Sequence, residues 1–203
     1  MAVQWVDLTS AQQQNAKMVA RATKMAFAVN NRDTQITMLA IAGAESGYDP
    51  RKRGDALANQ TGSNKTACTS INCGGYCSHG VWQIFVAWHY DKIMASGGPD
   101  ARYLPCEAVE WLYNPYNSAL IAKRIMDSSG LTAWTVYRNS STGAVPNHLA
   151  WMTVAETAMS IVENEDEIEP PPPPPNGDDE GPNLALVFGS GALLFLMWLF
   201  LPR

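Results

Sequence analysis

The chain has 203 residues, of which 46% are hydrophobic, and this is enough for one domain of ordinary size with an additional segment. Its net charge of −5 comes from one region, because residues 163–180 hold eight acidic residues and no basic one. Residues 1–162 carry 13 Lys and Arg against 11 Asp and Glu, a net +2, with no Gly-rich phosphate loop and no basic patch. These features argue against a nucleic-acid partner and allow an anionic polymer as substrate.

Two amphipathic or apolar helices are expected at the start of the chain. Residues 10–29 alternate Ala with Met and Val around three basic residues, after a cap at Thr9 and Ser10. A second helix begins near Thr34 and contains Met38, Leu39, Ile41 and Ala42. Gly47 and Pro50 stop it, so Glu45 falls in its last turn.

Glu45 is the first candidate for chemistry. A carboxylate in the last turn faces the negative end of the helix dipole, and its neighbours indicate partial burial. Both effects disfavour the ionised form, which suits a general acid. The alternative is a solvated glutamate at a helix end.

The rest of the chain reads mostly as loops followed by helices. Residues 50–80 are rich in Gly, Asn, Ser and Thr and predict loops with a short hairpin. Gly80–Tyr90 is expected to start a helix, and Asn114-Pro115 to open another that ends at Gly130. Leu131–Asn139 and Leu149–Val162 are interpreted as the last two helices. The expected fold is therefore mainly α.

The four cysteines suggest an oxidising environment. An even number in a loop-rich region predicts two disulfides, in any of three pairings. A zinc site that includes His79 is the alternative, although no C-x-x-C pair occurs. The residues concerned are Cys68, Cys73, Cys77 and Cys106.

The C-terminal part predicts a linker and a membrane anchor. Residues 163–183 combine the acidic run with six consecutive prolines, Pro170–Pro175, which favour a stiff spacer. Residues 184–201 contain no charge over 18 residues, about the length that crosses a bilayer as one helix. The N-terminus lacks the features of a signal peptide, so an extracytoplasmic enzyme would reach its site through this anchor or in a virus particle.

Three segments together resemble the superfamily of soluble lytic transglycosylases and goose-type lysozymes. The run Glu45-Ser46-Gly47-Tyr48-Asp49-Pro50 is followed by Gly80-Val81-Trp82-Gln83-Ile84 and then by Asn114-Pro115, with Gly130 to Tyr137 beyond. The likeness covers roughly residues 10–160 and is greatest for the lysozyme-like domains of bacteriophage particles. It implies an α+β lysozyme-like fold for residues 1–162.

The resemblance also implies roles for individual residues. Glu45 matches the catalytic acid, Ser46 a neighbour that holds the glycan, and Gln83 a glutamine that lines the cleft. Tyr137 matches a tyrosine whose hydroxyl faces the glutamate, although Arg138 follows it and Asn139 is displaced by one position. Trp82, inside the cleft motif, is the tryptophan selected as a sugar-stacking residue.

The expected function is cleavage of peptidoglycan glycan strands without a cofactor or a metal ion. The resemblance implies that a transglycosylase needs only Glu45. No second carboxylate stands out beside it, since Asp49 and Asp55 are interpreted as a cap and a loop charge, and a transglycosylase is therefore favoured over a hydrolase. The expected partners are the glycan, a lipid bilayer and other virion membrane proteins, in a virion membrane or a bacterial envelope. The alternatives are a muramidase-type hydrolase of a bacterial envelope and an inactive glycan-binding or structural virion protein.

Overall fold

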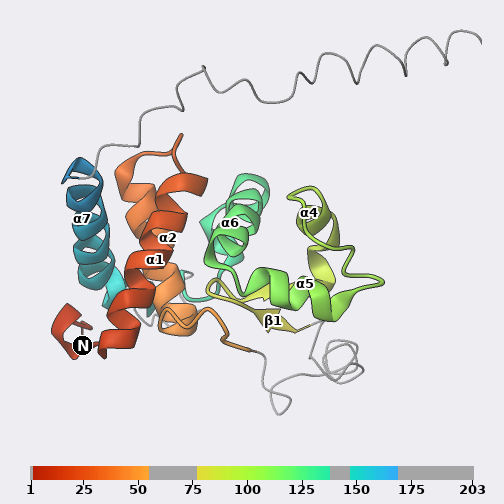
Figure 1. The fold of residues 1–203 in the computed structure, drawn as a ribbon, viewed down its shortest axis with the longest axis horizontal. Coiled ribbons are helices and arrows are strands. Elements are labelled where there is room, and N and C mark those ends of the chain that lie inside the picture. The colour runs from red at the N-terminus through yellow and green to blue at the C-terminus, as the bar shows by residue number, and fades with distance from the viewer. Residues whose placement is uncertain (1, 55–76, 138–146, 169–203) are drawn as a thin grey trace, which may run out of the picture. The chain divides into compact units, whose positions relative to one another are not determined.

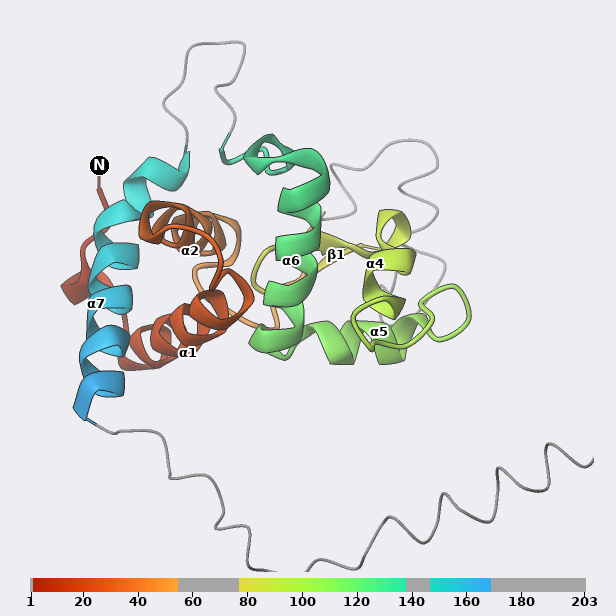
Figure 2. The same cartoon turned by 90° about the horizontal axis from the view of Figure 1, so that it is seen from above.

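The computed structural model describes residues 2–54, 77–137 and 147–168, which belong to one compact unit, residues 1–168. This part of the chain is mainly helical, as predicted, and contains one small antiparallel hairpin (Figure 1, Figure 2). The six consecutive prolines, Pro170–Pro175, and the predicted anchor, residues 184–201, lie outside the described residues. Among the helices that the structure describes, none combines the length and the hydropathy that a membrane span requires.

Helix α1 (Ser10–Ala26) follows a short 3₁₀ turn, η1 (Trp5–Asp7), and begins at the predicted cap. The Thr9 hydroxyl accepts a hydrogen bond from the Gln12 backbone N–H at 3.3 Å. The Gln12 side chain accepts one from the Thr9 backbone N–H at 3.0 Å. This reciprocal pair satisfies two backbone donors that the helix itself leaves open, and it fixes where α1 starts.

Helix α2 (Arg32–Ser46) packs against α1, η5 (Asn147–Trp151) and α7 (Met152–Ile168). The Asn31 side chain caps it by accepting from the Thr34 backbone N–H at 2.9 Å, so the predicted second helix is confirmed. Most of its central residues are buried, in a run of apolar and small side chains from Ile36 to Gly43. A helix that is apolar around its whole circumference needs neighbours on all sides, and this makes α2 a core element.

The segment Gly80–Tyr90 does not start a helix, so that prediction was wrong. Strand β1 (Ser78–His79) pairs with β2 (Ile84–Phe85) across a turn at residues 80–83. Gly80 and Gln83 have φ values of +76° and +51°, outside the helical region. A 3₁₀ turn, η3 (Val86–Trp88), and the short helix α4 (Tyr90–Met94) follow.

Helices α5 (Pro105–Leu112) and α6 (Pro115–Ser129) both begin with proline at the first helical position. The Asn114 side chain accepts from the Tyr116 backbone N–H at 2.9 Å and caps α6, as the Asn-Pro pair predicted. Helix α6 packs against α1 and also against α4 and α5 (Figure 2). It therefore joins the α1–α2–α7 group to the part that contains the hairpin.

The region after α6 is less regular than predicted. Leu131–Ala133 form only a 3₁₀ turn, η4, and residues 134–137 continue as a bend and turn, so the helix expected over residues 131–139 was wrong in its described part. The last predicted helix is present as η5 (Asn147–Trp151) followed by α7 (Met152–Ile168). Helix α7 extends six residues past Val162, which corrects the predicted start of the linker at Glu163.

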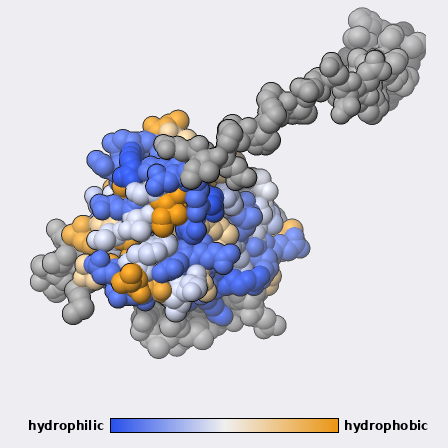
Figure 3. Space-filling model, turned by 60° about the vertical axis from the view of Figure 1, so that its left-hand side comes forward, coloured by the Kyte–Doolittle hydropathy of each residue, from blue (hydrophilic) through white to orange (hydrophobic). Residues whose placement is uncertain are grey.

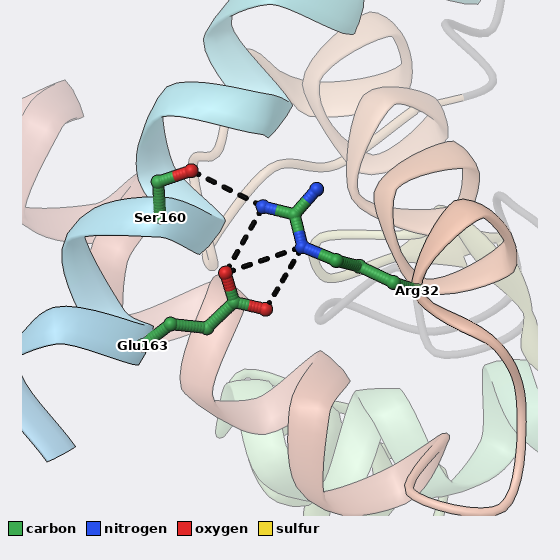
Figure 4. A network of polar contacts seen from close by, with 3 residues as sticks. All are labelled: Arg32, Ser160 and Glu163. Carbon is green, nitrogen blue, oxygen red and sulfur yellow. Dashed lines mark hydrogen bonds and ion pairs between the residues drawn. The ribbon is translucent and has the colours of Figure 1, made fainter. Parts of the chain in front are cut away.

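Ion pairs to α1 and α2 hold the part of α7 that continues past Val162. Arg32 donates to the Glu163 carboxylate from Nε at 3.0 Å and from Nη2 at 3.0 Å, and to the Ser160 hydroxyl at 3.1 Å (Figure 4). Glu165 pairs with Lys17 at 3.0 Å and with Arg21. At least two residues of the acidic run therefore belong to the folded unit.

The surface shown in Figure 3 is mostly hydrophilic, and its apolar side chains form separate small patches. Isolated exposed apolar residues are normal on a folded protein and do not indicate a docking surface. The feature that indicates function is a cavity at the end of α2.

Candidate functional site

The C-terminal end of α2 is fixed by close packing against Trp151. Gly47 adopts a left-handed conformation with φ +64° and donates its backbone N–H to the Gly43 carbonyl at 2.7 Å. A Cβ on Gly43 would approach the Trp151 ring to 2.6 Å, so only glycine allows this contact. Tyr48 is fully buried and its ring meets that of Trp151 edge-on at 5.5 Å. The backbone of Glu45 is therefore held in place by the packing of the residues before it and after it in the sequence.

Glu45 is half-buried and lines a cavity of about 620 Å³, together with Gln83. The two residues are 38 positions apart in the sequence, and the cavity brings them together as the resemblance implied. Lys52, His89 and Thr135 also provide polar groups around the cavity. Its apolar lining is Ile84, Phe85, Trp88, Ile125, Ala133 and Trp134. Such a mixture of aromatic surface with a few polar groups is typical of sites for small polar ligands.

Gln83 is held rigidly at the turn of the hairpin. Its side-chain amide donates to the Lys52 carbonyl at 3.0 Å and to the Gly80 carbonyl at 2.8 Å. A Cβ on Gly54 would overlap the Gln83 Oε1 atom. Gly54 in turn pairs with the hairpin, because its N–H donates to the Ser78 carbonyl at 3.0 Å. Glycine at position 54 and the two carbonyl acceptors thus place the amide oxygen.

Trp82 is a structural residue, and its selection as a sugar-stacking residue was wrong. Its side chain is 0% exposed and its indole N–H donates to the Met38 carbonyl of α2 at 2.9 Å. The indole N–H of Trp134 donates to the Trp82 carbonyl at 3.0 Å. These bonds attach the hairpin turn to α2 and to the turn after η4.

Ser46 and Tyr137 are not among the residues that line the cavity. The Ser46 hydroxyl donates to the Ala42 carbonyl one turn earlier at 2.9 Å. Tyr137 is half-buried, and its ring packs against that of His148 with centroids 4.8 Å apart. Asn139 lies outside the described residues. The structure therefore gives neither Ser46 nor Tyr137 a contact that places it in the site.

Glu45 is the one carboxylate among the described residues around the cavity. Asp49 is exposed and accepts a hydrogen bond from the Arg51 backbone N–H at 2.9 Å, the capping role that was considered for it. Asp55 lies outside the described residues. In the part of the site that the structure describes, one carboxyl group is available for proton transfer.

His89 is kept neutral by its surroundings. Burial and, to a smaller extent, the nearby Lys92 lower the pKa of His89 to about 4. Its Nδ1 atom is buried and has no hydrogen-bond partner among the described residues. A protonated imidazole would carry a poorly solvated charge there, so the cavity presents the neutral ring near pH 7.

The cysteine state agrees with the predicted oxidised form where it is described. Cys77 and Cys106 are both disulfide-bonded, and no cysteine in the described part is free. Cys68 and Cys73 lie outside the described residues. Among the residues that the structure describes, no group of three or more His, Cys, Asp or Glu is arranged to hold a metal ion.

The sequence interpretation missed Trp88, Phe85 and His89 as cavity residues. All three follow Gln83 within six positions, in the segment that was expected to be helical. If Gly80–Phe85 had been predicted as a hairpin, Trp82 could have been assigned to the core and Trp88 to the surface.

Comparison of the chain with protein-family models, curated proteins and solved structures finds no match.

Proposed function

We propose that this chain cuts the glycan strands of bacterial peptidoglycan, with Glu45 as the general acid. The observation that carries the proposal is that Glu45 and Gln83, the two motif residues of the resemblance, line the same cavity. The cavity is large enough for one or more sugar rings, since ligand sites typically measure about 300–1,000 Å³.

The chemistry requires a proton on the leaving oxygen of the glycosidic bond and stabilisation of an oxocarbenium-like centre. The Glu45 carboxylic acid donates the proton as the bond between the anomeric carbon and the oxygen breaks. The resulting carboxylate then takes a proton from the hydroxyl that attacks that carbon. With one carboxyl group described in the cavity, the substrate's own C6 hydroxyl is the proposed nucleophile, and this makes the enzyme a lytic transglycosylase.

A hydrolase is the alternative outcome of the same site. A water molecule would then replace the C6 hydroxyl, and Glu45 would activate it as general base. The sugar product distinguishes the two routes, because intramolecular attack leaves an anhydro ring whereas water leaves a reducing end.

The cellular context remains part of the proposal. Residues 184–201 are proposed as a single-pass anchor in a virion membrane or a bacterial envelope, where other virion membrane proteins would be neighbours. A phage protein that opens the cell wall during genome entry would combine a wall-cutting domain with such an anchor.

Turnover of purified peptidoglycan by the full-length protein in detergent tests the proposal. Glu45→Gln removes the transferable proton and keeps the shape of the side chain, so activity should fall by at least about 10²-fold. Glu156→Gln is the matched control, because Glu156 is an exposed carboxylate on α7 that does not line the cavity. Wild-type turnover by Glu45→Gln would overturn the site assignment. Binding of peptidoglycan without any turnover by the wild type would favour the inactive glycan-binding protein instead.

A further inference from the structure

Trp88 is an exposed tryptophan at the cavity. Its side chain is 69% exposed although it lines the cavity, whereas Trp82 and Trp134 are 0% and 5% exposed. Among the described large apolar residues with high exposure, Trp88 is the one that borders the cavity. A tryptophan left in water forgoes the stabilisation that burial would provide, and at a concave site this indicates a surface for a ligand.

Trp88 stands beside a second aromatic ring. The rings of Phe85 and Trp88 lie 4.8 Å apart with planes inclined at 53°, and both residues line the cavity. We call this pair the aromatic wall. Phe85 is half-buried and supports Trp88 from one side, so the indole keeps an open face.

The aromatic wall is fixed before any ligand arrives. Val86, between the two rings in sequence, is fully buried and donates its backbone N–H to the Cys77 carbonyl at 3.1 Å. Cys77 is itself buried and disulfide-bonded. The His89 N–H closes the 3₁₀ turn by donating to the Val86 carbonyl at 3.1 Å. A ligand that uses a preformed surface loses less binding free energy to ordering the protein.

We propose that the aromatic wall binds one pyranose ring of the glycan strand by stacking, and that Trp88 sets the affinity for the strand without taking part in proton transfer. A pyranose ring presents C–H groups on its faces and hydroxyl groups around its edge. An indole face matches the first, and the polar groups of the cavity, such as Gln83 and Lys52, lie where they can meet the second. This inference rests on the proposed function, because it takes the ligand to be the strand that Glu45 cuts.

Binding of a tetramer of β-1,4-linked N-acetylglucosamine to full-length Glu45→Gln protein in detergent tests the inference. In that background binding is measured without cleavage. Adding Trp88→Ala should weaken binding about five- to twentyfold, through the loss of apolar contact area. Trp88→Phe keeps a smaller ring and should fall between the two. Tyr103→Ala is the control, since Tyr103 is 80% exposed but does not line the cavity, and it should bind like the parent.

The kinetic test uses the protein with Glu45 intact and peptidoglycan as substrate. Trp88→Ala should raise KM by a larger factor than it lowers kcat, because stacking contributes to the ground state and the transition state alike. Equal binding by the Trp88→Ala and parent proteins would overturn the inference, as would an equal loss with Tyr103→Ala. If Trp88→Ala lowers the melting temperature, the indole N–H resonance of Trp88 in the folded parent carries the test, and it must shift on addition of the tetramer.

These results separate the inference from the proposed function. Binding that depends on Trp88 in a protein that never cleaves peptidoglycan would support the aromatic wall and refute the enzyme. Cleavage that depends on Glu45 with KM unaffected by Trp88→Ala would do the reverse.

Discussion

Each end of helix α2 carries a residue whose charge has the unfavourable sign for the helix dipole, and the two residues lie in different surroundings. Arg32 lies at the positive N-terminal end, and the carboxylate of Glu163 neutralises it on the surface (Figure 4). Glu45 lies at the negative C-terminal end and borders the cavity. The ion pair of Arg32 joins α2 to α7, and Glu45 lines a cavity that a ligand can enter.

Around the cavity, other groups also depart from ordinary packing rules. His89 Nδ1 is buried with no hydrogen-bond partner among the described residues, and Gln83 has a left-handed backbone. Local violations of this kind tend to gather where a protein uses its residues for function. On the α1–α2–α7 side, acidic residues of α7 form ion pairs with basic residues of α1 and α2. If the cavity side serves function and the α1–α2–α7 side serves stability, substitutions in the two parts should have different effects on turnover and on unfolding.

After Glu45→Gln, the largest effect is expected from a substitution at Gly54, which lies against the Gln83 side chain. Gly54→Ala places a Cβ where the Gln83 Oε1 atom lies, so the Gln83 side chain must leave its hydrogen-bonded position while the fold persists. Displacing a positioned group by about 1 Å can lower activity up to about 10²-fold, and we expect a loss of about 10- to 100-fold in turnover. The melting temperature should change little. The double variant with Gln83→Ala should be no worse than Gln83→Ala alone, and additive losses would contradict this positioning role.

A pH-dependent loss of stability is expected from His89. Its folded pKa of about 4 lies below the ordinary value of 6.5, so the unfolded chain binds the proton first as the pH falls. Protonation of His89 therefore leaves the free energy of unfolding unchanged above pH 6.5. As the pH falls towards 4, it lowers the free energy of unfolding by on the order of 1–3 kcal/mol. Melting curves over this range should show a smaller decline for His89→Gln. Parallel declines in the two proteins would show that His89 is not the group responsible.

Tyr48 gives a smaller effect of opposite sign. Its hydroxyl is fully buried and has no hydrogen-bond partner in the part of the chain that the structure describes. Burial raises the pKa of Tyr48, so the hydroxyl stays neutral. Tyr48→Phe removes an unsatisfied polar group and keeps the edge-on contact with Trp151. The free energy of unfolding should rise by about 1 kcal/mol. Denaturant titration measures this, and a clear loss of stability would show that the hydroxyl has a partner in solution.

The smallest effect is expected at the N-terminal end of α2, where Arg32 pairs with Glu163. A double-mutant cycle with Arg32→Gln and Glu163→Gln should give a coupling free energy of about 0.5 kcal/mol, because both side chains are partly exposed to water. The coupling should weaken at high salt, and turnover should stay at the wild-type level in all four proteins. A loss of turnover without a loss of stability would contradict the division between the two ends.

The sequence predicted the helices whose signals are local. Thr9 and Asn114 are caps that act within three residues, and α1 and α6 begin where they indicate. Helix α2 begins at Arg32 after the cap Asn31, two residues before the start that was predicted near Thr34. The position of Glu45 in the last turn followed from Gly47 in the same way. The pairing of Glu45 with Gln83 in one cavity was predicted from the motifs rather than from physical signals along the chain.

The errors arose where distant contacts decide the structure. The hairpin depends on pairing between Lys52–Gly54 and Ser78–Gly80, more than twenty residues apart, and the apolar run at Gly80–Tyr90 does not encode it. Trp82 and Trp88 have similar local surroundings in the sequence, yet one is buried and the other exposed. The acidic composition after Val162 suggested a linker because the basic partners Lys17, Arg21 and Arg32 lie more than 120 residues earlier.

The most direct test of the central claim is mass spectrometry of the fragments that the full-length protein releases from purified peptidoglycan. The account predicts glycan fragments with anhydro ends from the wild type and almost none from Glu45→Gln in the same time. Fragments with reducing ends would keep Glu45 as the acid and replace the C6 hydroxyl by water. Release of peptide fragments alone, or equal release of glycan fragments by both proteins, would contradict the account.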